Sequence, residues 1–461
     1  MQNKFFRAEH LKEACGVFGI FAPQEELARI TCYALYALQH RGQESAGIAI
    51  SDGDTIHLEK GMGLVSEVFP SLGKFEHLQG LAAIGHVRSA VAGTNKPENA
   101  QPLLVRFHQG ELAVAHNGNL VNAKELRQRL ELDGSIFQTT TDSELVAHLI
   151  ARCGRGELES SIADVLSYLR GSYAFIFLTE NKLIGVRDPR GISPLSLGKL
   201  GDHFVLASET CAFDTVGADF LRDVNPGEMV IIDREGMRSI QVFPRARSAL
   251  CIFEYIYFAR PDSNLNGKNV HLVRKRLGRR LAQEQPVEAD IVTGVPDSSI
   301  AAASGYAEEI GLPYEVGLVK NRYIGRTFIQ PTQARRDEGI KLKINPVKKI
   351  VEGKRVVIID DSIVRGTTSM RLVSLLFKAG AKEVHLRIGS PPVISPCYYG
   401  INTPTYEELI GAHHSCEQIR RKIGATSLAY LSRKGMLEAI GLTAESACDA
   451  CFSGEYPIWG G

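Results

Sequence analysis

The segment VVIIDDSIVRGTTS, at residues 356–369, constrains the fold more than any other part of the sequence. Its apolar start predicts a buried strand, and Asp360 and Asp361 follow at the carboxyl end, where ligands bind in open α/β sheets. Residues 362–369 form a small polar loop that enters a predicted helix, which suits phosphate binding through N–H groups and hydroxyls. The alternative, an acidic strand end that only caps a helix, leaves the Gly-Thr-Thr-Ser run unexplained.

The chain has two parts that differ in their pattern of predicted strands and helices. Residues 15–245 contain many short apolar runs that end at Gly, Asn or Asp, with a few helical patterns between them. This mixture predicts an α+β layered sandwich. From about residue 274, strands and helices alternate, which predicts a parallel sheet with crossover helices. The polar FPRAR segment at residues 243–247 marks the boundary, so we expect domains at 15–245 and 246–461.

Composition excludes several classes of protein. The formal net charge of the 461 residues is +1, so we expect no nucleic acid as the main partner. No uncharged apolar run approaches ~18 residues, so we expect no membrane span. The charged segment MQNKFFRAEHLKEA, at residues 1–14, is unlike a signal peptide. These features predict a cytoplasmic protein.

The loop at residues 356–369 resembles the fingerprint of type I phosphoribosyltransferases, which bind phosphoribosyl pyrophosphate. The resemblance implies an α/β domain in which the acid pair holds the ribose hydroxyls and Mg²⁺. Ser298, in the second strand-end loop GVPDSS, would help to hold the Mg²⁺ and pyrophosphate, although an ordinary turn is the alternative. The implied substrate-binding residues of the main loop are Asp360, Asp361, Ser362, Arg365, Gly366, Thr367, Thr368 and Ser369.

A basic segment, KNRYIGRTFIQP at residues 320–331, resembles the loop that closes over the substrate in the same family. Cationic side chains there would neutralise the leaving pyrophosphate. The residues concerned are Lys320, Arg322, Tyr323 and Arg326. A solvated basic loop is the alternative.

Cys15, in ACGVFGI, would by itself be taken for a buried structural thiol. Four further segments change that interpretation: YALQHRGQESAGIA, GHVRSAVAGTN, AHNGNL and TTDSELV. Together they resemble the class II glutamine amidotransferases, the N-terminal-nucleophile type, over residues 15–230. The resemblance implies an αββα sandwich. It also implies that residues 1–14 are a propeptide whose removal frees the α-amino group of Cys15.

The chemistry explains these residue types. A carboxamide is a poor electrophile, so the reaction needs a strong nucleophile and a stabilised oxyanion. The free amine, with a reference pKa of about 7.7–8.0, would act as the general base for the Cys15 thiol. The resemblance implies that Asn117 and the Gly118 N–H form the oxyanion hole. Arg88 would bind the glutamine α-carboxylate and Asp142 the α-ammonium. An ion pair between these two is the alternative.

Three neighbouring residues receive smaller roles. Arg41 is a supporting candidate near the nucleophile. His86 and His116 flank the motifs, and we expect them to pack in the core and not to act as bases.

Cys448 and Cys451 form a C-x-x-C pair, and Cys251 and Cys397 lie far from them in the sequence. One close pair and two remote cysteines can make a four-thiolate site. Zinc, a redox pair and no metal are alternatives. The family resemblance implies a structural [4Fe–4S] cluster on these four positions. The cysteines without a motif are Cys32, Cys153, Cys211 and Cys416.

The two halves together resemble enzymes that join both domains in one chain, from Cys15 to about Cys451. The subgroup resembled has both the propeptide and the cluster. The implied reaction converts glutamine, phosphoribosyl pyrophosphate and water into 5-phosphoribosylamine, glutamate and pyrophosphate, the first step of purine synthesis. Such enzymes pass ammonia along an enclosed path, are usually homotetramers and are inhibited by purine nucleotides.

Two rival functions belong to other classes. One is a regulator that senses phosphoribosyl pyrophosphate, which the complete set of glutaminase residues opposes, as does the lack of a basic DNA-binding segment. The other is a glutamine amidotransferase that aminates a sugar phosphate. The loop at residues 356–369 opposes it, since those enzymes carry a different acceptor domain.

Overall fold

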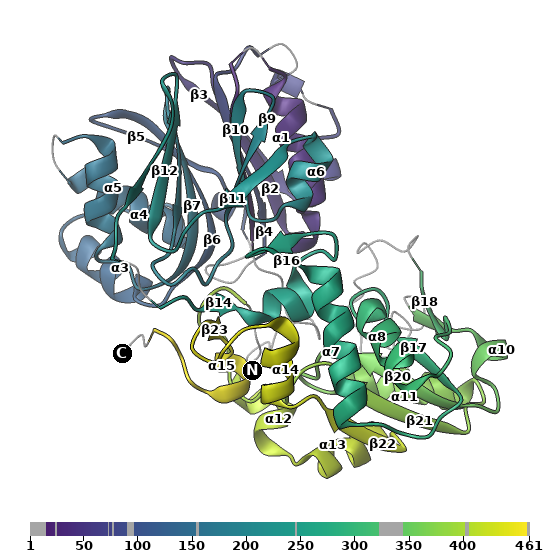
Figure 1. The fold of residues 1–461 in the computed structure, drawn as a ribbon. Coiled ribbons are helices and arrows are strands. Elements are labelled where there is room, and N and C mark those ends of the chain that lie inside the picture. The colour runs from purple at the N-terminus through teal and green to yellow at the C-terminus, as the bar shows by residue number, and fades with distance from the viewer. Residues whose placement is uncertain are drawn as a thin grey trace, which may run out of the picture.

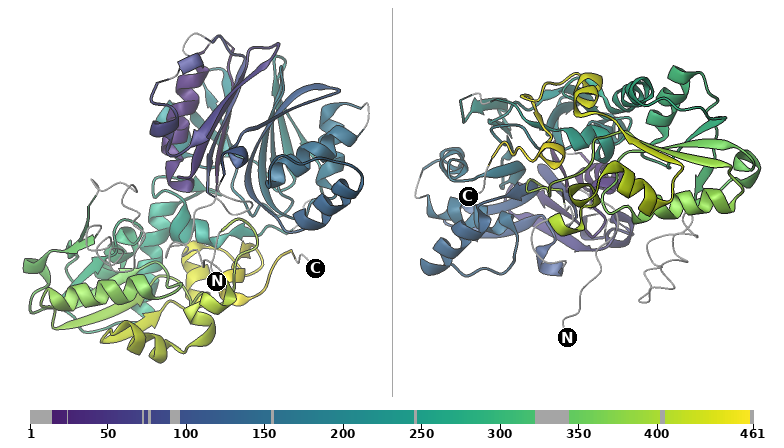
Figure 2. Two further views of the ribbon diagram at one scale, coloured as in Figure 1. Left: turned by 180° about the vertical axis from the view of Figure 1, so that it is seen from behind. Right: turned by 90° about the horizontal axis from the view of Figure 1, so that it is seen from below.

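The computed structural model describes residues 15–458 except 24, 72, 76–77, 90–95, 154–155, 245–246, 322–343 and 402–404. It has two lobes, and the C-terminal segment runs along their junction (Figures 1 and 2). Several predictions fall outside the described residues: the propeptide 1–14, the boundary at 245–246, and Arg322, Tyr323 and Arg326.

The first lobe contains two antiparallel sheets. One has seven strands in the order β11-β9-β10-β1-β4-β2-β3. Its strands are β1 Gly16–Phe21, β2 Ser45–Ser51, β3 Ile56–Met62, β4 Ala82–Arg88, β9 Ser196–Leu200, β10 His203–Ala207 and β11 Asp219–Asp223. The other has six strands in the order β13-β12-β8-β7-β6-β5. Its strands are β5 Leu103–Phe107, β6 Gly110–Leu120, β7 Gly171–Leu178, β8 Leu183–Arg187, β12 Glu228–Asp233 and β13 Gly236–Gln241.

Helices cover the outer faces of both sheets, as Figure 1 shows. On the first sheet they are α1 Leu27–Ala37, α2 Val65–Val68 and α6 Cys211–Val216. On the second they are α3 Ala123–Leu132, α4 Asp142–Arg152 and α5 Leu158–Leu166. The period of two along β1 explains the layering: Val17 faces the second sheet, whereas Phe18 packs among the helices. This arrangement confirms the predicted αββα sandwich.

The second lobe is built on a parallel sheet in the order β17-β20-β21-β22. Its strands are β17 Ile291–Gly294, β20 Arg355–Asp360, β21 Glu383–Ile388 and β22 Ser427–Tyr430. The helices are α7 Val270–Glu284, α8 Ile300–Ile310, α10 Lys348–Val351, α11 Thr367–Lys378, α12 Ile410–His413, α13 Cys416–Ile423, α14 Arg433–Ile440 and α15 Ala450–Ser453. One apolar cluster involves α7 and α8 and another involves α11 and α13, so both faces of the sheet are buried. The predicted parallel sheet with crossover helices is confirmed.

Short elements complete the fold. The remaining strands are β14 Leu250–Cys251, β15 Asn264–Leu265, β16 Lys268–Asn269, β18 Leu318–Lys320, β19 Ile344–Pro346 and β23 Ala447–Cys448. Single 3₁₀ turns occur at Gln39–Arg41, Gly73–Phe75, Pro97–Asn99 and Tyr406–Glu408, and a π-helix occurs at Glu254–Phe258. Because β14 pairs in parallel with β23, the C-terminal segment is tied to the start of the second lobe.

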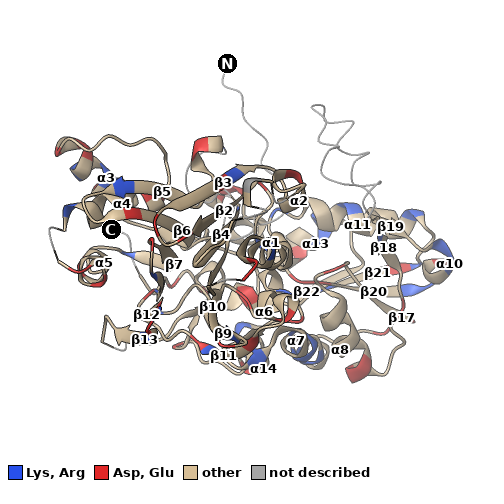
Figure 3. Ribbon diagram, turned by 90° about the horizontal axis from the view of Figure 1, so that it is seen from above, with Lys and Arg blue, Asp and Glu red and all other residues tan. Residues whose placement is uncertain are grey.

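Charged residues of both signs occur throughout the described part of the chain. Figure 3 shows acidic and basic residues interspersed over the view from above, in keeping with the net charge of +1. Within the described ranges, no helix has both the length and the apolar character needed to span a bilayer. The cytoplasmic location stays a prediction.

Helices α7 and α8 approach so closely that each needs a glycine at the contact. A Cβ on Gly278 would lie 1.8 Å from the Ala302 carbonyl oxygen, and one on Gly305 would lie 2.0 Å from the Lys275 carbonyl oxygen. Backbone atoms cannot move aside as a side chain can, so the two glycines set the distance between the helices.

We therefore expect Gly305→Ala to destabilise the protein by about 1–3 kcal/mol, the usual cost of overpacking, despite the better helix propensity of alanine. The thermal unfolding midpoint measures the effect. Ser304→Ala, at the adjacent half-buried position of α8, is the control and should change stability by less than about 0.5 kcal/mol. A midpoint for Gly305→Ala equal to that of the control would contradict the close approach.

Candidate active sites

Cys15 directly precedes β1, and its side chain is buried. It is 8% exposed, and its Sγ donates to the Ser89 carbonyl at 3.4 Å. Burial raises the pKa of the thiol, although the nearby Arg88 opposes that shift. The thiol is therefore held neutral and needs a base before it can act as a nucleophile.

Arg41 connects the nucleophile to the second domain. Its Nε donates to the Cys15 carbonyl at 3.1 Å, and its guanidinium binds Glu209 at 2.5 Å and Glu254 at 2.6 Å. Burial lowers the pKa of Arg41, but the two carboxylates outweigh this and raise the pKa above its ordinary value. Glu209 belongs to the first domain and Glu254 to the π-helix at the start of the second. The sequence singled out Arg41 but neither carboxylate.

Asn117 and Gly118 lie on β6 and have the features of an oxyanion site. Asn117 is 1% exposed, and within the described part of the chain neither atom of its amide group has a hydrogen-bond partner. Gly118 has a φ of +138°, and a Cβ there would lie 2.1 Å from the Ser172 carbonyl oxygen. Only glycine fits this position, because any larger residue would collide with the β7 backbone.

The two histidines link the sheets beneath these residues. His86 Nε2 lies 3.0 Å from the His116 carbonyl oxygen, which joins β4 to β6. Burial lowers the pKa of each to about 3, so both are neutral at working pH. This agrees with their expected packing role.

Asp142 and Arg88 supply opposite charges near the same strand ends. Asp142 begins α4, and its Oδ2 accepts the Leu120 N–H at 2.8 Å. Burial raises the pKa of Asp142 to about 6. A cationic ligand beside it would stabilise the charged carboxylate over the neutral acid. Arg88 ends β4 and is 2% exposed. The pair suits the two charged groups of a free amino acid.

The acid pair lies where two strand-end loops meet. β17 and β20 pair in parallel, so the GVPDSS loop lies beside the end of β20. Ser298 Oγ donates to Asp361 Oδ1 at 2.6 Å, and Ser299 Oγ donates to Asp360 Oδ1 at 3.4 Å. Burial and the adjacent Asp361 raise the pKa of Asp360. Two carboxylates and a hydroxyl suit Mg²⁺, which also takes water and substrate oxygens.

The loop after the acid pair has the features of a phosphate site. It enters α11 through Gly366, whose φ is +80°. The hydroxyl oxygens of Thr367 and Thr368 are buried and accept or donate no hydrogen bond to the described residues. Together with the first N–H groups of α11, these hydroxyls can surround a phosphate.

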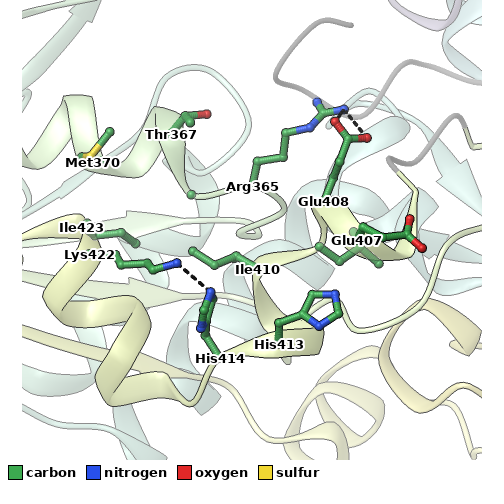
Figure 4. Close-up of a pocket in the computed structure, with 12 residues that line it drawn as sticks. Arg365, Thr367, Met370, Glu407, Glu408, Ile410, His413, His414, Lys422 and Ile423 are labelled. Carbon is green, nitrogen blue, oxygen red and sulfur yellow. Dashed lines mark hydrogen bonds and ion pairs between the residues drawn. The ribbon is translucent and has the colours of Figure 1, made fainter. Parts of the chain in front are cut away.

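A pocket of about 380 Å³ adjoins this loop (Figure 4). Arg365 forms an ion pair with Glu408 at 3.2 Å on one side, and Lys422 Nζ lies 2.6 Å from His414 Nε2 on the other. The Arg365 guanidinium thus contacts Glu408 and not the predicted phosphate position. A second pocket of about 560 Å³ lies beside the GVPDSS loop, where Lys320 pairs with Asp297 at 3.0 Å.

The four cysteines of the expected cluster site are close to one another. Cys251 and Cys448 are register partners in β14 and β23. Burial raises the pKa of the Cys451 thiol, and the charges of Cys251, Cys448 and Cys397 add to that shift. Cys397 Sγ accepts the Tyr399 N–H at 3.3 Å. Buried sulfurs with a backbone N–H donor fit thiolate ligation. In the residues with described positions, however, no three His, Cys, Asp or Glu side chains already form a metal-binding group.

Comparisons with known proteins also indicate two domains of different families. A family model described as a glutamine amidotransferase domain matches residues 86–215, and one described as a phosphoribosyl transferase domain matches residues 266–388. Amidophosphoribosyltransferase of Bacillus subtilis (strain 168) is 56% identical over 452 residues, which cover 97% of this chain and 94% of that protein.

Two solved structures match nearly the whole chain. Glutamine phosphoribosylpyrophosphate amidotransferase from B. subtilis, in complex with ADP and GMP, has a TM-score of 0.92 at 55% identity and covers 96% of this chain and 98% of that one. A structure described as the allosteric regulatory enzyme of purine biosynthesis has a TM-score of 0.93 at 56% identity and covers 96% of each chain. The fold, the order of the domains and the extent of the identity lead to one conclusion: the chain belongs to the amidophosphoribosyltransferase family.

Proposed function

We propose that this chain releases ammonia from glutamine in its first domain and uses it in the second to displace pyrophosphate from phosphoribosyl pyrophosphate. The products are 5-phosphoribosylamine, glutamate and pyrophosphate, the first step of de novo purine synthesis. The supporting observation is that each site has buried polar atoms without a partner among the described residues: the Asn117 amide in one and the Thr367 and Thr368 hydroxyls in the other. Such atoms cost about 1–3 kcal/mol each, which a ligand would recover.

In the first domain, removal of residues 1–14 gives Cys15 a free amine that accepts the thiol proton. The sulfur then attacks the glutamine carboxamide carbon, and the oxyanion receives hydrogen bonds from Asn117 Nδ2 and the Gly118 N–H. The amine returns its proton to the departing ammonia. Water then hydrolyses the thioester to glutamate. Arg88 and Asp142 hold the α-carboxylate and α-ammonium of the substrate throughout.

In the second domain, Asp360 and Asp361 bind the ribose hydroxyls, and the hydroxyls of Thr367 and Thr368 bind the 5′-phosphate. The acid pair and Ser298 would hold Mg²⁺, which would supply positive charge for the pyrophosphate. Further groups of the loop and the basic segment would complete the binding site: the hydroxyls of Ser362 and Ser369, the Gly366 N–H, and the side chains of Lys320, Tyr323 and Arg326. Arg365, which pairs with Glu408 in the structure, would have to leave that partner to join them. Ammonia attacks the anomeric carbon of the ribose as the bond between that carbon and pyrophosphate breaks.

Two further properties belong to the same proposal. The B. subtilis relative was solved with ADP and GMP, and we infer that purine nucleotides inhibit this chain also. Their phosphates match the chemistry of the loop at residues 362–369. A homotetramer remains the expected assembly.

We also propose a [4Fe–4S] cluster on Cys251, Cys397, Cys448 and Cys451. The cluster would have a structural role, because it would bind β14, β23 and residue 397 together. Zinc on the same four thiolates is the alternative.

The two reactions should be separable. We expect Cys15→Ala to abolish pyrophosphate release with glutamine and to preserve it with ammonia, because only the first domain loses its nucleophile. Asp361→Asn should do the reverse and preserve glutamate release. Cys32→Ala removes another buried thiol, on α1, and should retain both activities. Glutamine-dependent synthesis by Cys15→Ala would refute the proposal.

The pH profile should report Asp142. Burial raises its pKa from 3.8 to about 6, so the carboxylate is lost as the pH falls through 6. The N-terminal amine titrates higher, at about 7.7–8.0. As the pH is lowered, we therefore expect kcat/KM for glutamine to fall in two steps, of which the step at lower pH should lie near pH 6.

Asp142→Asn should remove the lower step and reduce kcat/KM about 10–100-fold, the value of a charged hydrogen bond. Glutamate release measured from pH 5 to 9 tests both statements. A lower step that persists in Asp142→Asn would assign it to another group.

The cluster can be tested without an activity assay. Protein purified without oxygen should be brown and contain iron and labile sulfide, and Cys448→Ser should lose all three. Cys416→Ser, a second-domain thiol with an exposed side chain, is the control and should retain them. Zinc in place of iron, or full cluster content in Cys448→Ser, would contradict the assignment.

A further inference from the structure

A loop of the second domain, residues 397–401, lies directly on the oxyanion strand of the first. A Cβ on Gly400 would be 3.3 Å from Gly118 Cα and 3.6 Å from its carbonyl carbon. Asn119 Nδ2 donates to the Tyr398 carbonyl at 2.8 Å. We call residues 397–401 the covering loop, because they lie over the backbone from Gly118 to Asn119.

The covering loop is itself firmly held. Tyr399 is 4% exposed, and its hydroxyl donates to the Ile458 carbonyl at 2.6 Å and accepts the Ile458 N–H at 2.9 Å. Tyr456 donates its hydroxyl to the Pro396 carbonyl at 2.6 Å. These hydrogen bonds attach the covering loop to the C-terminal segment of the chain. A displacement of that segment would therefore move the loop that lies against Gly118.

The oxyanion strand has three attachments near its end. Gly118, Asn119 and Leu120 pair with Tyr173, Ser172 and Gly171 of β7, and the Leu120 N–H is bound by Asp142 at 2.8 Å. Both of these belong to the first domain. The third attachment is the covering loop, which contacts the intervening residues from the other domain.

This third attachment acts on the carboxyl side of Gly118, at its Cα and carbonyl carbon and at the Asn119 side chain. With a φ of +138°, Gly118 has no side chain of its own to resist a turn of the adjacent peptide. Because a Cβ on Gly400 would lie 3.3 Å from Gly118 Cα, the covering loop packs close to Gly118 and limits its displacement toward Gly400. The Asn119 hydrogen bond fixes the next residue. An oxyanion donor acts only when it points at the developing charge, so these contacts matter for rate.

We propose that Asn119 and Gly400 are positioning residues for glutamine hydrolysis, and that the second domain thereby sets the geometry of the oxyanion hole in the first. The proposal rests on the oxyanion role assigned above to Asn117 and Gly118. Neither positioning residue touches substrate; each acts through Gly118.

The first test is Asn119→Ala. We expect kcat for glutamate release to fall about tenfold, as for other small displacements of catalytic groups, with KM for glutamine unchanged. Pyrophosphate release with ammonia should be unchanged. Alkylation of Cys15 by iodoacetamide forms no oxyanion, so its rate should also be unchanged. If the Asn119 contact only stabilised the fold, glutamate release, ammonia-dependent pyrophosphate release and the alkylation rate would all fall together.

The matched control is Asn122→Ala. Asn122 Nδ2 donates to the Tyr168 carbonyl at 2.9 Å and its Oδ1 accepts the Arg170 N–H at 3.0 Å, so this variant removes the same kind of bond, and one more, within the first domain. This variant should keep the wild-type kcat. Gly400→Ala places a methyl group against Gly118 and should lower kcat further than Asn119→Ala, again with the alkylation rate preserved.

The outcomes separate the two levels of the proposal. Wild-type kcat in Asn119→Ala, or an equal loss of alkylation or of ammonia-dependent activity, would overturn the positioning role. If Asn117→Ala instead hydrolyses glutamine at the wild-type rate, the oxyanion assignment itself fails. A large loss in Asn117→Ala with none in Asn119→Ala would leave the proposed function intact and remove only this inference.

Discussion

The rest of the structure depends on one buried cation. The Arg41 side chain is 1% exposed and lies between Glu209 of the first domain and Glu254 of the second. A buried charge is tolerated only with its partners present, and removing one partner leaves the other uncompensated. Arg41 also holds the Cys15 carbonyl. The position of Cys15, the proposed nucleophile, is therefore determined partly by a carboxylate that the second domain provides.

The same domain reaches the glutamine site from two directions. Glu254 approaches the backbone of Cys15 through Arg41, and the covering loop approaches Gly118. Cys251 lies three residues before Glu254, and Cys397 begins the covering loop. Both cysteines lie near the C-terminal segment, since β14 pairs with β23 and Tyr399 binds Ile458. A group that joined the cysteines would thus hold both contacts in place.

The sequence predicted the parts of this arrangement that depend on local chemistry. The acid pair, the phosphate loop and the GVPDSS loop follow from strand ends in a parallel sheet, and the structure brings them together. The contacts between domains have no such pattern. Arg41 and Glu254 are 213 residues apart, and Asn119 and Tyr398 are 279 apart. Only the lone carboxylate in the apolar run CIFEYIYF indicated that Glu254 has a buried partner.

Burial shifts the pKa of three acidic groups of the two sites in the same direction. It raises the pKa of the Cys15 thiol, of Asp142 and of Asp360, and so disfavours the charged form of each. Each proposed partner has the opposite tendency: the N-terminal amine takes the proton of the thiol, the substrate ammonium faces Asp142, and Mg²⁺ faces the acid pair. Each of these charged forms is therefore stabilised further when maturation or binding supplies its counterpart.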